Sequence, residues 1–177
     1  MIVEQVDSEQ PSLHWKYIEC NGKVAVDFGC GRWEHIEFRD PSWPTTPEYL
    51  AQLGASKVYA FDIDHNEINW YIENVTPTYP QITPICSDIN SVDVVRGIYN
   101  QYKPDVIKCD IEHNERFILE LSDEEFSIPS FYALETHTDN LYQAFFDRFN
   151  ALNYEVISTI DLVHAPPMKV IFAKKKN

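Results

Sequence analysis

Short apolar runs alternate with segments of helical spacing along most of this chain. The clearest run, Val24-Ala25-Val26-Asp27-Phe28, consists almost entirely of apolar residues. Such a run is typical of a parallel strand that helices cover on both sides, because both of its faces are then buried. Four later runs have the same character, and we expect a strand in each: residues 58–62, 82–86, 105–110 and 131–135.

The segments between these runs carry helix start and stop signals. Thr46, Pro47 and Gly54 suit the N-cap, the first helical position and the end of a helix over residues 46–54. Asp64 is expected to cap the next helix, whose apolar residues recur at helical spacing as far as Val75. Further helices are expected over residues 92–102, 117–121 and 139–152.

The two ends of the chain have weaker or different patterns. Residues 1–12 are polar and predict a loosely held lead-in, whereas 13–19 alternate apolar and polar side chains, as a half-buried edge strand does. Residues 154–160 and 168–173 read as two strands with no room for a helix between them, so we expect an antiparallel hairpin.

Together these elements predict an α/β fold with a doubly wound, mostly parallel seven-stranded sheet that ends in the C-terminal hairpin. Helices should cover both faces of this sheet. We expect residues 1–177 to form a single domain, in which residues 1–21 are the lead-in and the edge strand.

Composition narrows the class of protein. The 177 residues are 44% hydrophobic and 24% charged, which fits a globular domain rather than a disordered chain. The net charge of −14 repels phosphate backbones, so we expect no nucleic-acid partner. No apolar run is long enough to cross a bilayer and no signal peptide is recognised, so we expect no membrane. Four scattered cysteines suggest a reduced, cytoplasmic protein.

A glycine turn directly after the first strand is the first candidate for chemistry. Asp27, Gly29 and Gly31 form an Asp-x-Gly-x-Gly sequence, whose glycines permit a tight turn and the close approach of a ligand to the backbone. Asp62 ends the next strand. In a doubly wound sheet this acid lies beside the glycine turn and can accept both ribose hydroxyls of a nucleoside. The alternative is that Asp62 only caps a helix.

The segment after the glycine turn departs from the simplest nucleotide-binding pattern. Arg32 and Trp33 stand where a third glycine and the start of a helix are expected. Residues 34–46 are rich in aromatic residues, charges and proline, so a helix is not expected there. Because this loop leaves the functional edge of the sheet, we interpret it as a lid over the ligand, with a simple insertion as the alternative.

Two motifs in the second half carry a resemblance to a known family. Lys108-Cys109-Asp110-Ile111-Glu112-His113-Asn114-Glu115 is similar to a Lys-x-Asp-x-Glu-Gly-x-Glu pattern, and Glu135-Thr136-His137 is similar to a later Glu-x-His pattern. With the order of the elements and the final hairpin, the chain over about residues 22–174 resembles class I S-adenosylmethionine-dependent methyltransferases. Within that class the second half resembles the FkbM-type family.

The resemblance implies a Rossmann-like methyltransferase fold, S-adenosylmethionine as the cofactor and a role for each cofactor-binding residue. The methionine part would be surrounded by Asp27, Gly29, Cys30 and Gly31. Asp62 would bind the ribose hydroxyls, Asp88 would accept the adenine amino group, and Ile89 would lie beside the adenine ring. Asp110 and Glu112 would line the floor where the methyl group faces the acceptor. For Asp88 the alternative is a plain turn residue.

Histidines and carboxylates form the candidate catalytic group. A cationic sulfonium suits a carboxylate-rich pocket, and transfer to a hydroxyl requires that the acceptor loses its proton. The candidates for that general base are His137, His113, Glu112 and Glu135. The same side chains could hold a divalent metal. In the absence of a spacing signature we expect the metal-free role and no metal site.

Three functions remain open at this stage. The first is an O-methyltransferase that acts on a hydroxyl of a sugar or a small metabolite. The second is a non-catalytic binding protein that retains the methyltransferase fold. The third, a nicotinamide-dependent oxidoreductase, is disfavoured because the chain closes with a hairpin instead of another parallel strand.

Overall fold

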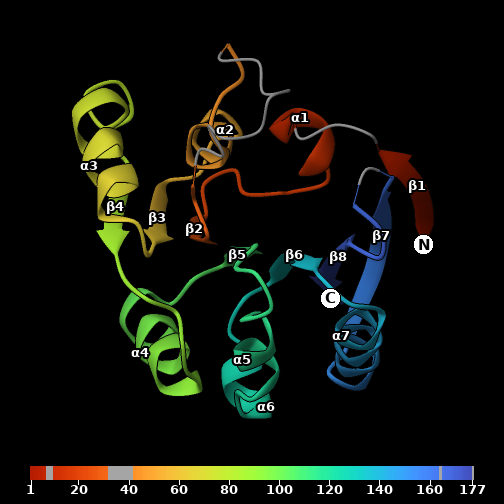
Figure 1. Ribbon diagram of the computed structural model, residues 1–177. Helices are drawn as coiled ribbons and strands as arrows, with labels where there is room; N and C mark the ends of the chain where they lie inside the picture. Colours follow the sequence, from red (N-terminus) through yellow and green to blue (C-terminus); the bar gives the residue numbers. More distant parts are fainter. Residues whose placement is uncertain (7–9, 32–41, 164, 177) are drawn as a thin grey trace.

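The computed structural model describes residues 1–6, 10–31, 42–163 and 165–176. The predicted departure at Arg32 and Trp33, and most of the loop interpreted as a lid, lie outside these residues. The described chain forms an α/β structure in which a sheet separates two layers of helices (Figure 1). The predicted Rossmann-like α/β architecture is therefore confirmed, although the number of strands differs from the prediction.

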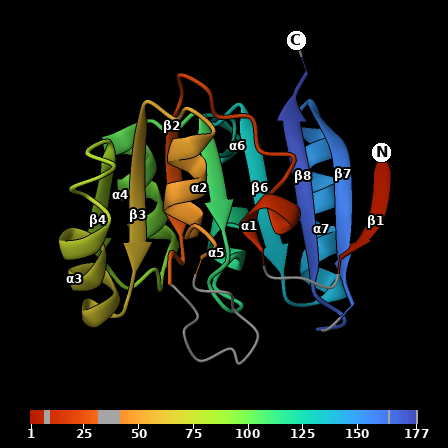
Figure 2. The ribbon, with the colours of Figure 1, turned by 90° about the horizontal axis from the view of Figure 1, so that it is seen from above.

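The sheet contains eight strands within the described residues, one more than predicted, in the order β1-β7-β8-β6-β5-β2-β3-β4. The arrow of β8 runs against those of β3, β5 and β6 in Figure 2, and β8 pairs antiparallel with both β6 and β7. The predicted C-terminal hairpin is thus present. The strands are β1 Ile2–Val6, β2 Val24–Phe28, β3 Lys57–Asp62, β4 Ile82–Cys86, β5 Val106–Cys109, β6 Phe131–Thr136, β7 Tyr154–Leu162 and β8 Lys169–Lys175.

The additional strand corrects the prediction for the start of the chain. Residues 2–6 pair parallel with β7 at the edge of the sheet, whereas residues 1–12 were expected to be a loose lead-in. The expected edge strand over residues 13–19 is also wrong, because Pro11 begins a helical turn, α1, that ends at His14. Leu13 is 42% exposed and His14 only 2% exposed, the reverse of what the alternation predicted.

Helices cover both faces of the sheet, as predicted. α1, α2 and α3 lie on one side and α4 to α7 on the other (Figure 1). The N-cap of α2 is Thr45, one residue before the predicted Thr46, and its side chain forms a capping box with Glu48. The helices are α1 Pro11–His14, α2 Thr46–Gln52, α3 His65–Asn74, α4 Val92–Tyr102, α5 Arg116–Leu119, α6 Asp123–Phe126 and α7 Asp139–Ala151.

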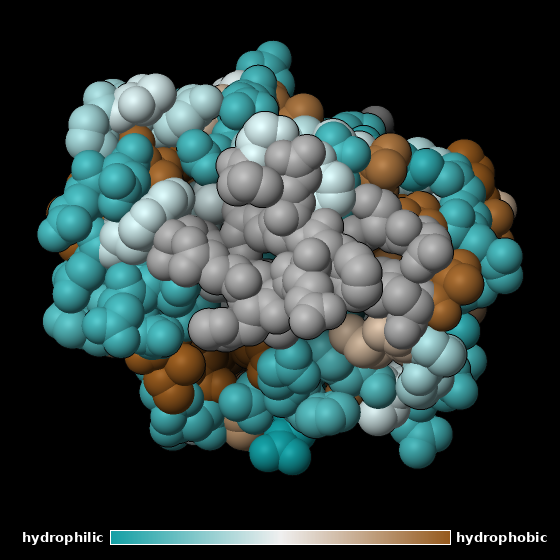
Figure 3. Space-filling view, turned by 45° about the horizontal axis from the view of Figure 1, so that its top comes forward, coloured by the Kyte–Doolittle hydropathy of each residue, from teal (hydrophilic) through white to brown (hydrophobic). Residues whose placement is uncertain are grey.

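Two apolar cores lie between the sheet and its helices, because successive side chains of a buried strand point to opposite faces. In β2, Ala25 packs into the core under α2 and α3, whereas Val26 and Phe28 pack into the core over α4 to α7. Among the residues that carry a hydropathy colour in Figure 3, hydrophilic side chains predominate. Within the described residues, none of the helices combines the length and apolarity that a membrane crossing requires.

The order of the strands creates a position where a ligand can bind. The chain moves outward from β2 to β3 and β4, then crosses back to β5 on the other side of β2. The connections after β2 and β5 therefore leave toward opposite faces and open a crevice beyond the carboxyl ends of the two strands. The glycine turn after β2 and Asp110 after β5 stand at this crevice.

Candidate functional site

The turn after β2 requires a glycine at position 29. Gly29 has a φ of +78°, and its N–H donates a hydrogen bond of 2.9 Å to the carbonyl of Phe61 at the end of β3. A Cβ added here would lie 1.7 Å from the backbone oxygen of Asp110. The turn therefore passes directly against the end of β5, which no side chain at position 29 permits.

A cavity of about 400 Å³ opens beside this turn. Its size falls at the lower end of the range that small-molecule sites occupy, about 300–1,000 Å³. Residues that follow β2, β3, β4 and β5 contribute to its wall. The wall includes seven of the residues predicted for the site: Gly29, Gly31, Asp62, Asp88, Ile89, Asp110 and Glu112.

Asp62 projects into this cavity from the end of β3. One of its oxygens, Oδ1, accepts a 2.8 Å hydrogen bond from the backbone N–H of Asp64, and the other, Oδ2, lies 3.2 Å from where a Cβ on Gly31 would stand. The helix that follows is capped by Asp64, whose side chain accepts from the N–H of Asn66. Burial raises the pKa of Asp62, and the neighbouring N–H groups oppose that rise.

Asp88 and Ile89 reach the cavity from the loop after β4. Asp88 is exposed, and its Oδ2 accepts a 2.8 Å hydrogen bond from the side-chain amide of Asn90. Ile89 is 5% exposed and packs against the core over α4. One residue is thus polar and accessible, and its neighbour offers a fixed apolar surface to the cavity.

Asp27 and Cys30 do not contribute to the cavity wall. Asp27 is completely buried, and its Oδ1 lies 2.9 Å from Nζ of Lys108, which is its neighbour across β2 and β5. Lys108 also donates a 2.8 Å hydrogen bond to the carbonyl of Gly29. Burial raises the pKa of Asp27 to about 6, although the charge of Lys108 opposes this rise.

Lys108 therefore ties Asp27 to the glycine turn from inside the sheet. Cys30 is 1% exposed and its side chain belongs to the core beneath α2 and α3, while its carbonyl accepts a hydrogen bond from the hydroxyl of Tyr71. In this structure both predicted residues support the turn from behind.

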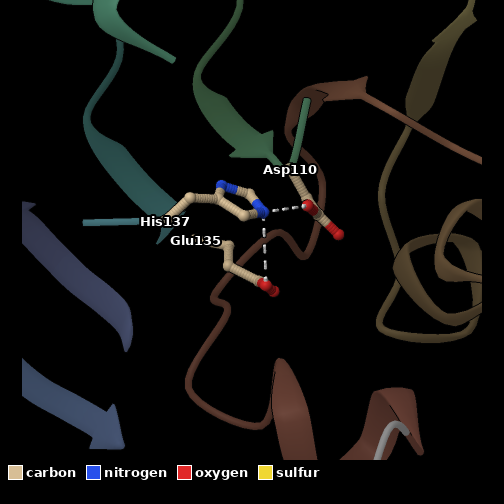
Figure 4. Close-up of side chains that lie close together, drawn as sticks. All are labelled: Asp110, Glu135 and His137. Atoms are coloured by element: carbon tan, nitrogen blue, oxygen red, sulfur yellow. Dashed lines mark ion pairs between the residues drawn. The ribbon is translucent and has the colours of Figure 1, made fainter. Parts of the chain in front are cut away.

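His137 gathers with three carboxylates where β5 and β6 end, and two of them, Asp110 and Glu135, are drawn with it in Figure 4. Nε2 of His137 lies 3.7 Å from Oδ1 of Asp110, 3.8 Å from Oε1 of Glu135 and 3.6 Å from Oε2 of Glu112. We call these four residues the acidic cluster. Asp110 and Glu112 belong to the cavity wall as well, so the cluster adjoins the cavity.

Two further residues contact the acidic cluster, and neither of them is assigned a role from the sequence. Oε1 of Glu115, a residue with no exposed surface, lies 2.5 Å from Nδ1 of His137. Nε2 of His14 lies 2.8 Å from Oε2 of Glu135. Glu115 stands in the motif that carried the family resemblance, which was the available signal. For His14 the local pattern was misleading, because it predicted an exposed side chain and the residue is buried.

The charges of the cluster act strongly on one another. Burial and the charge of Glu135 raise the pKa of Asp110. Burial lowers the pKa of His137, but its contact with Glu115 and the surrounding carboxylates outweigh this effect and raise it to about 9. Burial also raises the pKa of Glu135, yet His14 and the other cations bring it below its usual value. The pKa values of these groups are thus set largely by burial and by one another's charges.

His113, the remaining catalytic candidate, lies at the rim of the cluster. Its exposed ring has its centroid 5.3 Å from that of His137. Glu112 and His113 both have positive φ values, 49° and 72°. His113 occupies the position that is glycine in the family pattern, and its backbone adopts the left-handed conformation that glycine favours.

Comparison with known proteins finds relatives of this chain by fold and not by sequence. No protein-family model matches the chain, and no curated protein was found with a similar sequence. Solved structures do match in fold. A proposed RNA methyltransferase from Pyrococcus horikoshii is 15% identical with a TM-score of 0.60, and the match covers 96% of this chain and 82% of the other.

Two more solved structures match this chain in fold. A proposed tRNA (m1A22) methyltransferase from Streptococcus pneumoniae is 12% identical with a TM-score of 0.63, covering 97% of this chain and 72% of the other. A proposed S-adenosylmethionine-dependent methyltransferase from Listeria monocytogenes is 15% identical with a TM-score of 0.61, covering 95% and 97%. The chain therefore has the Rossmann-like fold of class I S-adenosylmethionine-dependent methyltransferases.

These neighbours correct one expectation. The net charge of −14 predicts no nucleic-acid partner and leaves a small molecule or a sugar as the acceptor, and that exclusion of nucleic acid is wrong. Two of the three structures are described as methyltransferases of RNA or tRNA, so this fold does serve nucleic-acid acceptors. The physical reason is that net charge sums over the whole chain, whereas binding depends on the local distribution of charge.

Proposed function

We propose that this chain is an S-adenosylmethionine-dependent methyltransferase that transfers a methyl group to a hydroxyl oxygen. The observation that carries the proposal is the cavity at the β2/β5 crevice, whose wall combines a glycine turn with carboxylates from successive strand ends. That combination fits a nucleoside with a cationic substituent. Bound S-adenosylmethionine would supply an electrophilic methyl group on a positively charged sulfur.

The residues present fit this cofactor. Gly29 and Gly31 contribute to the cavity wall without side chains, and side chains there would meet Asp110 and Asp62. Asp62 would accept the ribose hydroxyls, and Asp88 with Ile89 would hold the adenine. Asp110 would place a carboxylate near the cationic end of the cofactor. Asp27 and Cys30 would act through the shape of the turn.

The acidic cluster would serve the acceptor. Of the four catalytic candidates, Glu112 is the one that belongs to the cavity wall, and its side chain is 60% exposed. We assign the removal of the acceptor proton to this carboxylate. His137 and Glu135 would orient the acceptor oxygen from behind, with His113 at the rim.

Two finer assignments belong to the same proposal. Membership of the FkbM-type family is supported by the contacts of His137 with Asp110 and Glu115, because these contacts join the two motifs on which the resemblance depends. A cytoplasmic location is supported by the four cysteines, which are all free thiols in the structure. Because two structures with this fold are described as RNA or tRNA methyltransferases, RNA is one of the acceptors to be tested.

Calorimetry and a methyl-transfer assay test this function together. We expect the chain to bind S-adenosylhomocysteine, the demethylated product, and not NAD. Incubation with radiolabelled S-adenosylmethionine and pools of hydroxylated small molecules or RNA should then identify the acceptor. Binding without transfer to any pool would favour a non-catalytic protein that retains the fold, and binding of NAD alone would refute the proposal.

Asp62→Ala is expected to weaken the binding of S-adenosylhomocysteine about 10- to 100-fold. The reason is that hydrogen bonds to a charged group contribute about 1.5–3 kcal/mol. Isothermal calorimetry measures the change. Asp147→Ala, which removes an exposed carboxylate on α7, is the matched control and should bind like the wild type. An unchanged affinity of Asp62→Ala would remove the ribose role.

Glu112→Gln is expected to lower turnover about 10²- to 10⁴-fold, which is the usual contribution of a general base. Its affinity for S-adenosylhomocysteine should change little, because the substitution keeps the shape of the side chain. Initial rates with the acceptor found above measure the effect. Glu155→Gln, on the exposed side of β7, is the control. Full activity in Glu112→Gln would exclude this residue as the base.

A further inference from the structure

Two carboxylates and one imidazole converge at the carboxyl ends of β5 and β6. Figure 4 shows the side chains of Asp110, Glu135 and His137 pointing toward a common centre. Each offers one ligand atom, and these three atoms lie within 4.8 Å of one another. Metal–ligand bonds of about 2.0–2.2 Å place neighbouring ligands of one ion about 3–3.5 Å apart. The distances of 3.7 and 3.8 Å from Nε2 of His137 therefore need only a small contraction.

The imidazole supplies an observation that is independent of the acidic residues. His137 has a side chain only 4% exposed, and among the described residues its Nε2 makes no hydrogen bond. A buried polar atom usually has a partner, since its desolvation is otherwise uncompensated. Nε2 points at the carboxylates without reaching hydrogen-bond distance, which is the arrangement of a ligand atom around a cation.

Residues behind the three ligands hold them in orientation. Oε1 of Glu115 lies 2.5 Å from Nδ1 of His137, so this carboxylate can hold a proton on Nδ1 while Nε2 faces the other two ligands. His14 lies 2.8 Å from Oε2 of Glu135 and leaves Oε1 to face His137. Metal-binding histidines characteristically donate their other N–H to a carboxylate, and metal-binding carboxylates are held in the same way.

We propose that Asp110, Glu135 and His137 bind a divalent first-row transition-metal ion, either Mn²⁺ or Zn²⁺. The imidazole favours these ions over Mg²⁺, which prefers oxygen ligands and water. Glu112, whose Oε2 lies 3.6 Å from Nε2, can add a fourth ligand from the cavity side. This proposal replaces the sequence-based expectation that the cluster is metal-free.

The proposed metal binding does not depend on the proposed function. The role of the bound ion in methyl transfer does rest on that function. Asp110 belongs to the cavity wall, so an ion bound there would have positions open toward an acceptor. On that side an ion would orient the acceptor oxygen and lower the pKa of its hydroxyl. The test below contains neither cofactor nor acceptor, so it can fail or succeed whatever the reaction is.

Titration of the chelator-treated chain with Mn²⁺ tests the site directly. The loss of the free Mn²⁺ electron paramagnetic resonance signal should show one ion per chain, and Zn²⁺ should displace it. At Mn²⁺ about 100 times above its Kd, the Tm should rise by about 5–10 °C. Absence of both the one-to-one binding and the rise in Tm would overturn the proposal.

Variants then locate the ion. Asp110→Asn, Glu135→Gln and His137→Gln should each weaken Mn²⁺ binding more than the 10- to 100-fold that loss of a supporting residue typically causes. Glu155→Gln and His65→Gln remove the same chemical groups from exposed positions and should bind like the wild type. Asp110→Asn should disturb packing least, because the Asp110 side chain is 11% exposed and those of Glu135 and His137 are each 4% exposed. Equal Mn²⁺ affinity in the wild type and a folded Asp110→Asn would also overturn the proposal.

Discussion

Gly29→Ala is expected to destabilise the protein by about 3 kcal/mol or more and to abolish binding of S-adenosylhomocysteine. Two costs add at this position. A non-glycine residue at a φ of +78° is strained by about 1–3 kcal/mol. The new Cβ would also lie 1.7 Å from the carbonyl oxygen of Asp110, so β5 or the turn must shift. Since Asp110 belongs to the cavity wall, this shift damages the site as well.

Urea denaturation followed by tryptophan fluorescence measures the loss of stability, and calorimetry measures the binding. Gly97→Ala is a control with the opposite sign. Gly97 is exposed in the interior of α4, and a Cβ there would meet no atom within 4 Å. Alanine at this position should stabilise the protein by about 0.5–1 kcal/mol. A Gly29→Ala variant that loses less than about 1 kcal/mol would contradict the tight turn described here.

Lys108→Met is expected to cost about 3–5 kcal/mol of stability, because it leaves the carboxylate of Asp27 buried without its partner. Lys108 is 1% exposed and Asp27 has no exposed surface, so water cannot replace the lost charge. The carbonyl of Gly29 would lose its donor at the same time. Urea denaturation measures the change in the free energy of unfolding.

A double variant separates the loss of the ion pair from the loss of packing. Asp27→Asn combined with Lys108→Met removes both charges, and it should recover about half of the stability that Lys108→Met loses. Lys174→Met is the surface control, since Lys174 pairs with Glu19 in an exposed position and should cost no more than about 1 kcal/mol. A double variant as unstable as the sum of its single variants would show that the two charges are not coupled.

Much of the central sheet follows from local pattern. The strands over residues 24–28 and 82–86 have the predicted bounds. For β2 the reason is that a strand covered by helices on both sides must be almost entirely apolar. Pro84 within β4 is compatible with a strand, since β4 lies at the edge of the sheet and its proline costs no necessary hydrogen bond. Helix α4 likewise occupies residues 92–102, as its spacing predicted.

Contacts between distant segments explain what the pattern missed. β1 is a strand because it pairs with β7, more than 150 residues later, and residues 2–6 carry no local signal of that partner. His14 is buried because it meets Glu135, and the alternation around it suggested the opposite. A local pattern cannot report a partner that arrives from the far end of the chain.

The sequence by itself determined the alternation of strands and helices, the glycine turn and the acids at the strand ends, because each is encoded within a few neighbouring residues. Only the tertiary structure decided that Asp27 pairs with Lys108 inside the sheet and that Glu115 and His14 hold the acidic cluster. Those partners come from separate strands and turns. Their charges become consequential only where folding removes the water that would otherwise screen them.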